Sequence, residues 1–293
     1  MFSLAPPIAT SSDREWCWFL RGFGKSGDVI ERALYAIGVM DHSGWATWQH
    51  SSLTATGAPV VVRFATCERA LSIITEVANP AHDPATKLAT ACNIITALGG
   101  IAPDQAFREV ISAAQGASAL TWGACLGLRH DGKQLQFTLY AELPAEAHDL
   151  SALLSQIDPG ACQGAYMLAY DTRGRRITYY CKPDSTTPLP AVLGGAQPVS
   201  TRNEMGAPHN RAFAIDPATV LSGQSRLARQ VNSFKQIVFR RHPCLVDHQL
   251  TEFPETAVVG NIWVTGNGPD NKVVSFDLAA PWIGADHPVA LVV

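Results

Sequence analysis

The sequence has little charge, and it lacks the segments that bind nucleic acid or membranes. Only 16% of its 293 residues are charged, the formal net charge is −3, and no block of basic residues occurs. We therefore expect no nucleic-acid partner bound through phosphates. No apolar run is long enough to span a bilayer, and residues 1–16 show no basic segment followed by an apolar core, so we expect neither a membrane segment nor a signal peptide. These absences favour a cytoplasmic protein.

Cysteine pairs and metal-ligand motifs are also lacking. The seven cysteines are odd in number and scattered, at positions 17, 67, 92, 125, 162, 181 and 244. We expect them to be reduced, buried thiols. His242, Cys244 and His248 lie close together, but Pro243 interrupts the run and no CxxC partner is present. We interpret them as loop or cap residues and expect no metal site.

What the sequence has is an apolar fraction of 47%, enough for a large core, and a regular succession of helical and strand patterns. Residues 1–15 are expected to form a loose tail. Helices are expected at 28–40, after a cap at Ser26 or Asp28, and at 83–98, 104–115, 145–158 and 223–241. The 83–98 helix has the strongest start signal, because Asp83 is a good N-cap and Pro84 suits the first helical position.

Strand patterns come in consecutive pairs. The five pairs are 58–66 with 70–78, 118–130 with 133–143, 163–172 with 175–182, 198–205 with 210–216, and 257–266 with 272–280. Consecutive hairpins favour antiparallel pairing. Helical segments separate or flank most pairs, so an αββα unit recurs along the chain. The predicted fold is α+β: one domain over 1–293, with a ten-strand antiparallel barrel inside a ring of helices. Such closure removes exposed edges and leaves room for a central ligand.

Two polar rows alternate with apolar residues on the central strands. The first row is Gln136, Thr138, Tyr140 and Glu142, and the second is Arg176, Thr178, Tyr180 and Lys182. Side chains two apart share one face of a strand. In a sandwich this face would be solvated, whereas in a barrel covered by helices it would line the lumen. Trp122, and Trp263 and Ser275 of the last hairpin, lie either in ordinary packing or in a substrate pocket.

The pattern resembles the ABBA aromatic prenyltransferases, and within them the dimethylallyltryptophan-synthase-like branch. The stretches that carry the resemblance are GAPVVVRF, LSIITEVANP, LQFTLYAELP and RRITYYCKP. It implies metal-independent transfer of a dimethylallyl or geranyl group from its diphosphate to an electron-rich aromatic acceptor, indole- or tryptophan-derived, in secondary metabolism. The isoprenyl diphosphate is then a co-substrate and no cofactor is required.

The resemblance also implies roles for particular residues. Tyr140 matches the tyrosine of a Lys-x-Tyr element, and Arg176 and Tyr180 match the ends of an Arg-x-Lys-x-Tyr element. The expected diphosphate-binding residues are Arg63, Tyr140, Arg176, Tyr180 and Lys182. The expected catalytic bases are Glu76 and Glu142. The expected substrate-pocket residues are Trp122, Thr138, Thr178, Trp263 and Ser275.

The chain departs from the family pattern at several of these positions. Thr138 and Thr178 stand where the family has lysine, and Ser72 where it has arginine. The family's early glutamate falls among Val60, Val61 and Val62, which are apolar. An alternative therefore stays open, namely an ABBA-like barrel that binds or cyclises a small aromatic metabolite without diphosphate chemistry.

Overall fold

The computed structural model describes a large part of the chain. The described residues are 20, 23–40, 47–48, 50–53, 59–65, 70–116, 119–144, 154–156, 164–182, 198–204, 207–215, 259–265 and 273–279. For Phe64, Ala65 and the strands from residue 198 onward, only the backbone is described. The expected tail at 1–15, the helix at 223–241, most of the helix at 145–158 and the His242–His248 run lie outside these residues.

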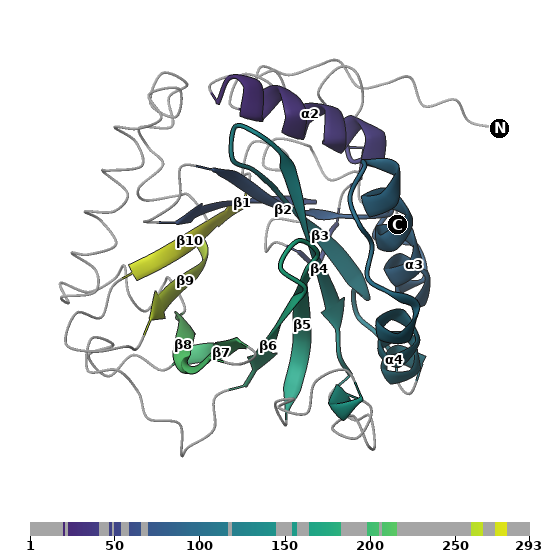
Figure 1. Cartoon of the computed structure of the whole chain (residues 1–293), viewed down its shortest axis with the longest axis vertical. Coiled ribbons are helices and arrows are strands. Elements are labelled where there is room, and N and C mark those ends of the chain that lie inside the picture. Colours follow the sequence, from purple (N-terminus) through teal and green to yellow (C-terminus); the bar gives the residue numbers. More distant parts are fainter. Residues whose placement is uncertain are drawn as a thin grey trace, which may run out of the picture.

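The described strands pair in chain order, and every pairing is antiparallel. Their bounds are β1 (Val60–Ala65), β2 (Leu71–Glu76), β3 (Ala124–His130), β4 (Leu135–Glu142), β5 (Ala165–Asp171), β6 (Arg176–Cys181), β7 (Pro198–Glu204), β8 (Ala207–Ile215), β9 (Val259–Thr265) and β10 (Val273–Ala279). Each strand pairs with the next, and β10 pairs with β1, so the ladder closes on itself (Figure 1). The five predicted hairpins and their antiparallel pairing are confirmed.

The largest difference from the predicted bounds is at β3, which begins at Ala124 instead of residue 118. The backbone amides of residues 121–123 donate to the Glu142 carboxylate, so this segment forms a loop around that side chain and not a ladder.

Three helices among the described residues cover one side of the sheet: α2 (Lys25–Ile37), α3 (Pro84–Ala97) and α4 (Gln105–Gly116). Helix α3 packs on β3 and β4, α2 packs on β3, and α3 contacts α4 (Figure 1). The start of α3 is as predicted, because Asp83 Oδ1 accepts a hydrogen bond from the Ala85 amide at 3.0 Å.

The predicted cap of α2 is wrong. Its N-cap is Gly24, and no side chain caps it. Ser26 lies inside the helix, and its hydroxyl hydrogen-bonds with His130 Nδ1 at 2.9 Å. A tertiary contact with β3 therefore takes the hydroxyl that local pattern assigned to the helix start.

Apolar side chains divide into two clusters according to the face of the sheet. Val60 and Val62 belong to the large core that includes residues of α2, α3 and α4, whereas Val61 between them does not. The second cluster, called the inner cluster below, consists of Val61, Ile74, Cys125, Tyr140, Ala169 and Tyr180, with Leu53, Trp122, Tyr166 and Met167 packed against it. Tyr140 and Tyr180 are therefore on the face away from the helices. Each tyrosine of the two predicted polar rows therefore faces inward, as expected for a sheet covered from outside.

Among the described helices, none combines the length and the apolar character that crossing a membrane requires.

Candidate active site on the inner face of the sheet

Two tyrosines and an arginine meet on the inner face. The rings of Tyr140 on β4 and Tyr180 on β6 lie 6.4 Å apart, tilted by 57°. Arg63, on β1, reaches across the inner face, where its Nη1 donates to the Tyr140 hydroxyl at 3.1 Å. Three of the predicted diphosphate-binding residues are therefore brought together. The half-buried Trp122 packs against the same cluster, so the group combines aromatic faces with a fixed positive charge.

Gly127 on β3 leaves the space that the Tyr140 ring occupies. In the ladder Gly127 stands opposite Thr138, two residues before Tyr140. A Cβ at position 127 would lie 3.0 Å from Tyr140 Cε2 and 3.2 Å from Thr138 Cβ, closer than such contacts normally come. The absence of a side chain here therefore lets the tyrosine ring lie over β3.

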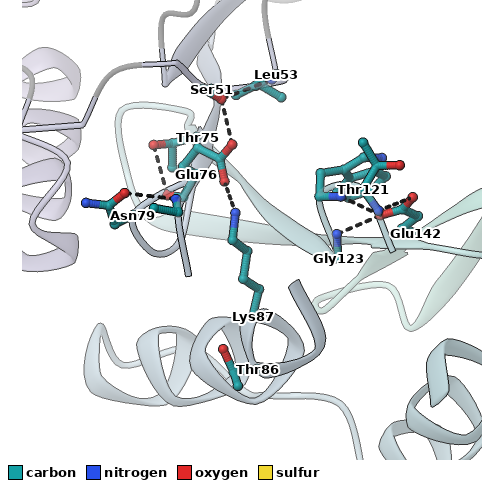
Figure 2. Close-up of polar contacts among 12 residues, drawn as sticks. Ser51, Leu53, Thr75, Glu76, Asn79, Thr86, Lys87, Thr121, Gly123 and Glu142 are labelled. Atoms are coloured by element: carbon teal, nitrogen blue, oxygen red, sulfur yellow. Dashed lines mark hydrogen bonds and ion pairs between the residues drawn. The ribbon is translucent and has the colours of Figure 1, made fainter. Parts of the chain in front are cut away.

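Glu76, the last residue of β2, is held by two buried polar groups. Its Oε2 forms an ion pair with Lys87 Nζ of α3 at 3.1 Å, and its Oε1 accepts from the Ser51 hydroxyl at 2.6 Å (Figure 2). The Lys87 and Glu76 side chains are only 2% and 3% exposed. Charges are tolerated at such burial when they are paired and hydrogen-bonded, as here. The carboxylate is thus fixed in orientation at the end of the strand, beside the inner cluster.

Cys125, a member of the inner cluster, is a direct neighbour of Glu76. Cys125 stands directly opposite Glu76 in the ladder of β2 and β3. Burial, followed by the Glu76 carboxylate, raises the pKa of the Cys125 thiol far above its usual value, while the cations of Lys87 and Arg63 oppose that shift. Glu76, Lys87 and Arg63 therefore all act on one point of the inner face.

Glu142, the other predicted base, binds backbone amides. Its carboxylate accepts from the amides of Thr121 at 3.0 Å and of Trp122 and Gly123 at 2.7 Å each (Figure 2). Gln115 of α4 adds hydrogen bonds to the carbonyls of Gly123 at 2.8 Å and of Glu142 at 3.0 Å. In this structure Glu142 fixes the loop that carries Trp122. Glu76 stands opposite Cys125 of the inner cluster, and Glu142 stands opposite Met167, which packs against that cluster.

Arg176 and Lys182 are not brought to the inner cluster. Arg176 is the first residue of β6, its side chain is 71% exposed, and Nη2 lies 3.5 Å from Asp171 Oδ2. Lys182 follows the end of β6 and is exposed. The expected single surface of Tyr140, Arg176, Tyr180 and Lys182 is thus divided. The two tyrosines lie inside, and the two cations lie at opposite ends of the strand.

The remaining predicted pocket residues lie at known ladder positions. Thr138 and Thr178 are half-buried, opposite Asp171 and Ala169 respectively. Trp263 on β9 stands opposite Ser275 on β10, as the last hairpin predicts. The side chains of these two residues lie outside the described part of the structure.

Sequence reasoning missed Lys87, Ser51 and Arg129. Lys87 had a signal, because it stands one residue before Leu88 and four before Ala91 on the buried stripe of α3. A lysine on such a stripe needs a buried partner. Arg129 is in phase with Cys125 on β3, and its Nη1 donates to Gln136 Oε1 at 2.6 Å. Ser51 had no signal, because it lies in a loop.

Within the described residues no group of three or more His, Cys, Asp or Glu side chains is placed to hold a metal ion. The described cysteines Cys92, Cys125 and Cys181 are buried and form no disulfide.

Comparison with known proteins gives matches in structure but not in sequence. No protein-family model and no curated protein matches the chain. A crystal structure of 5-dimethylallyl tryptophan synthase from Streptomyces coelicolor, in complex with DMASPP and Trp, matches with a TM-score of 0.66 at 14% identity, over 98% of this chain and 99% of that one. A second structure of 5-dimethylallyltryptophan synthase from this organism matches with a TM-score of 0.65 at 11% identity, over 94% and 99%.

The structure of NotF in complex with brevianamide F and DMSPP matches with a TM-score of 0.51 at 14% identity, over 93% of this chain and 95% of that one. Such low identities establish the fold alone. The chain therefore has the fold of the ABBA aromatic prenyltransferases, which its sequence pattern resembles.

Proposed function

We propose that the chain is a cytoplasmic aromatic prenyltransferase of secondary metabolism. It transfers a dimethylallyl or geranyl group from the diphosphate to an electron-rich aromatic acceptor, indole- or tryptophan-derived, and needs neither metal nor cofactor. The whole chain is one domain, with a ring of helices around a ten-strand barrel. The observation that carries the proposal is the meeting of Arg63, Tyr140 and Tyr180 beside the buried Glu76 on the inner face of the closed ladder. The prenyltransferase structures with the same fold contain DMASPP with Trp, or DMSPP with brevianamide F, which supports this choice.

The proposed reaction begins with loss of diphosphate. The bond between the allylic carbon and the diphosphate oxygen breaks, and its electron pair leaves with the diphosphate. Arg63 supplies a positive charge to that leaving group, and the Tyr140 hydroxyl supplies a hydrogen-bond donor. The allylic cation then lies against the faces of Tyr140, Tyr180 and Trp122, which stabilise positive charge through their ring electrons. The buried aromatic face also excludes water, which would otherwise capture the cation.

The second step joins the allylic carbon to a ring carbon of the acceptor. The ring donates an electron pair to the cation, and the new bond leaves a positively charged ring that must lose the proton at that carbon. Glu76 is the proposed base, because Lys87 and Ser51 each hold one of its oxygens in a fixed direction. The products are the prenylated aromatic compound, diphosphate and the protonated base, so atoms and charge balance.

A direct assay tests the function. Purified protein is incubated with dimethylallyl or geranyl diphosphate and with tryptophan, indole or an indole-containing dipeptide, in EDTA, and products are identified by mass. We expect a prenylated product, strongly reduced in Glu76→Gln and unchanged in Glu109→Gln, which alters an exposed carboxylate of α4. Failure to bind any isoprenyl diphosphate at millimolar concentration would refute the proposal.

One observation favours the alternative function, a barrel that binds or cyclises an aromatic metabolite without diphosphate chemistry. Thr138 and Thr178 offer hydroxyls where the family has ammonium groups, and the nearby Arg176 and Lys182 are exposed. Under this alternative an indole-containing ligand raises the melting temperature in the absence of any diphosphate, and inorganic pyrophosphate does not.

A further inference from the structure

A second polar group crosses the inner face closer to the hairpin turns than Glu76. Arg63 on β1 stands opposite Ser72 on β2, Ser72 stands opposite Arg129 on β3, and Arg129 stands opposite Gln136 on β4. These positions are in phase with the inner cluster, since Val61, Ile74, Cys125 and Tyr140 each lie two or four residues along the same strands. The ladder therefore places one arginine on either side of one serine.

The Ser72 hydroxyl can donate a hydrogen bond to a ligand. Ser72 is 9% exposed, and its Oγ has no hydrogen-bond partner among the described residues. A buried hydroxyl without a partner destabilises the folded protein, and folded proteins seldom contain one without a reason. Between two cationic side chains, the partner that gains most from this hydroxyl is an anionic oxygen.

The two arginines are oriented by their neighbours. Arg129 Nη1 donates to Gln136 Oε1 at 2.6 Å, while Gln136 Nε2 donates to Asp131 Oδ2 at 3.1 Å. Arg63 Nη1 donates to the Tyr140 hydroxyl. Both side chains are half-buried, in surroundings that screen charge less than bulk water does. Asp277 stands opposite Arg63 on the β10 side of the ladder, and its side chain lies outside the described part.

From this arrangement we propose that Arg63, Ser72 and Arg129 bind the diphosphate of the allylic donor on the wall formed by β1, β2 and β3. The inference rests on the proposed function. It adds Ser72 and Arg129 to Arg63 as anion-binding residues, in place of the Arg176 and Lys182 expected from the sequence. Ser72 and Glu76 are four residues apart on β2, which is about 13 Å at the rise of a strand. The allylic chain and the acceptor ring occupy the space between the anion and the base, against Tyr140.

Calorimetric binding of inorganic pyrophosphate, and of a non-reactive thiolo analogue of dimethylallyl diphosphate, tests the site. Arg129→Gln is expected to weaken both by at least about tenfold, since hydrogen bonds to charged groups contribute about 1.5–3 kcal/mol. Ser72→Ala is expected to weaken both by about threefold or more, and among the described residues it removes no hydrogen bond. The matched control is Arg32→Gln on the outer helix α2, which should bind as the wild type does.

The outcomes separate this site from the proposed function. If wild-type protein transfers the prenyl group while Arg129→Gln and Ser72→Ala bind pyrophosphate normally, the function stands and this site is wrong. If Arg176→Gln weakens pyrophosphate binding as much as Arg129→Gln does, the proposed site is also wrong, and the exposed Arg176 belongs to the anion site. If wild-type protein neither binds pyrophosphate nor reacts, both proposals fail. Circular dichroism of each variant shows that it is folded, and Ser72→Ala decides the matter should Arg129→Gln not fold.

Discussion

The buried ion pair between Glu76 and Lys87 gives the sharpest prediction for stability. Removing one member of a buried pair leaves the other charge without its partner and costs about 3–5 kcal/mol. We therefore expect Glu76→Gln and Lys87→Met each to lower the free energy of unfolding by about 3–5 kcal/mol, or the melting temperature by roughly 10 °C. Replacing both charges is expected to recover most of this loss, because no unpaired charge remains buried.

A double-mutant cycle measured by urea unfolding checks the magnitude. The coupling energy between the two substitutions should be about 3 kcal/mol, whereas most exposed ion pairs give below about 1 kcal/mol. Lys133→Met is the matched control, because Lys133 is an exposed lysine in the turn between β3 and β4. Its cost should stay within about 0.5 kcal/mol. Single variants that unfold at the wild-type urea concentration would refute the reasoning from burial.

The double variant also separates stability from chemistry. Glu76→Gln with Lys87→Met should be folded and should bind pyrophosphate, because neither residue belongs to the proposed anion site. It should lose prenyl transfer by at least about 100-fold, the usual contribution of a general base. A stable double variant with wild-type turnover would show that another group accepts the ring proton.

Three further predictions concern neighbouring positions. Gly127→Ala should displace the Tyr140 ring, destabilise the fold by about 1–3 kcal/mol through overpacking and reduce turnover; a crystal structure with the ring unmoved would contradict this. Glu142→Ala should cost about 2–3 kcal/mol in urea unfolding, because three backbone amides lose their acceptor, and Glu142→Gln should cost less. Burial raises the pKa of the Cys125 thiol in the folded protein above the value of 9.0 that it has when unfolded. The unfolded chain therefore loses this proton first as the pH rises above 9.0, and the free energy of unfolding falls by up to about 1.4 kcal/mol per pH unit. Cys125→Ala should remove that part of the loss between pH 8 and pH 10; an unchanged slope would show that the thiol ionises as readily in the folded protein.

The sequence predicted the hairpins well because their signals are local. Asp131-Gly132 and Arg173-Gly174 mark tight turns, and alternation on either side places Tyr140 and Tyr180 on one face. The same alternation placed Arg176 in that row, yet its side chain is exposed. A period of two residues predicts the face of a strand on which a side chain lies, but not its position along the strand relative to residues of the neighbouring strands. That position depends on the register between strands that are far apart in sequence, which no local pattern contains.

The contacts of Glu76 show the same limit. The alternation on β2 predicted which face of the strand Glu76 lies on. Its two partners could not be predicted in this way, because Ser51 reaches it from a loop and Lys87 from a helix on the other side of the sheet. The register of β2 with β3, across the intervening helices, also brings Arg129 beside Ser72. Long-range pairing brings these residues together, and the sequence alone suggested them only one strand at a time.

The separation of Ser72 and Glu76 along β2 also explains how one face could hold both an anionic diphosphate and a carboxylate base. In the proposed site a carboxylate must act on the same substrates as the cations that hold a diphosphate. A unit negative charge about 4 Å from the carboxylate would be repelled by about 4 kcal/mol at an effective dielectric constant near 20. At the separation of about 13 Å between the levels of Ser72 and Glu76, the repulsion falls to about 1 kcal/mol. Thr138, at the level between them, adds no charge to either end. Under the proposed function, a lysine there would attract the diphosphate toward Glu76, whereas the neutral hydroxyl would keep the anion and the base apart.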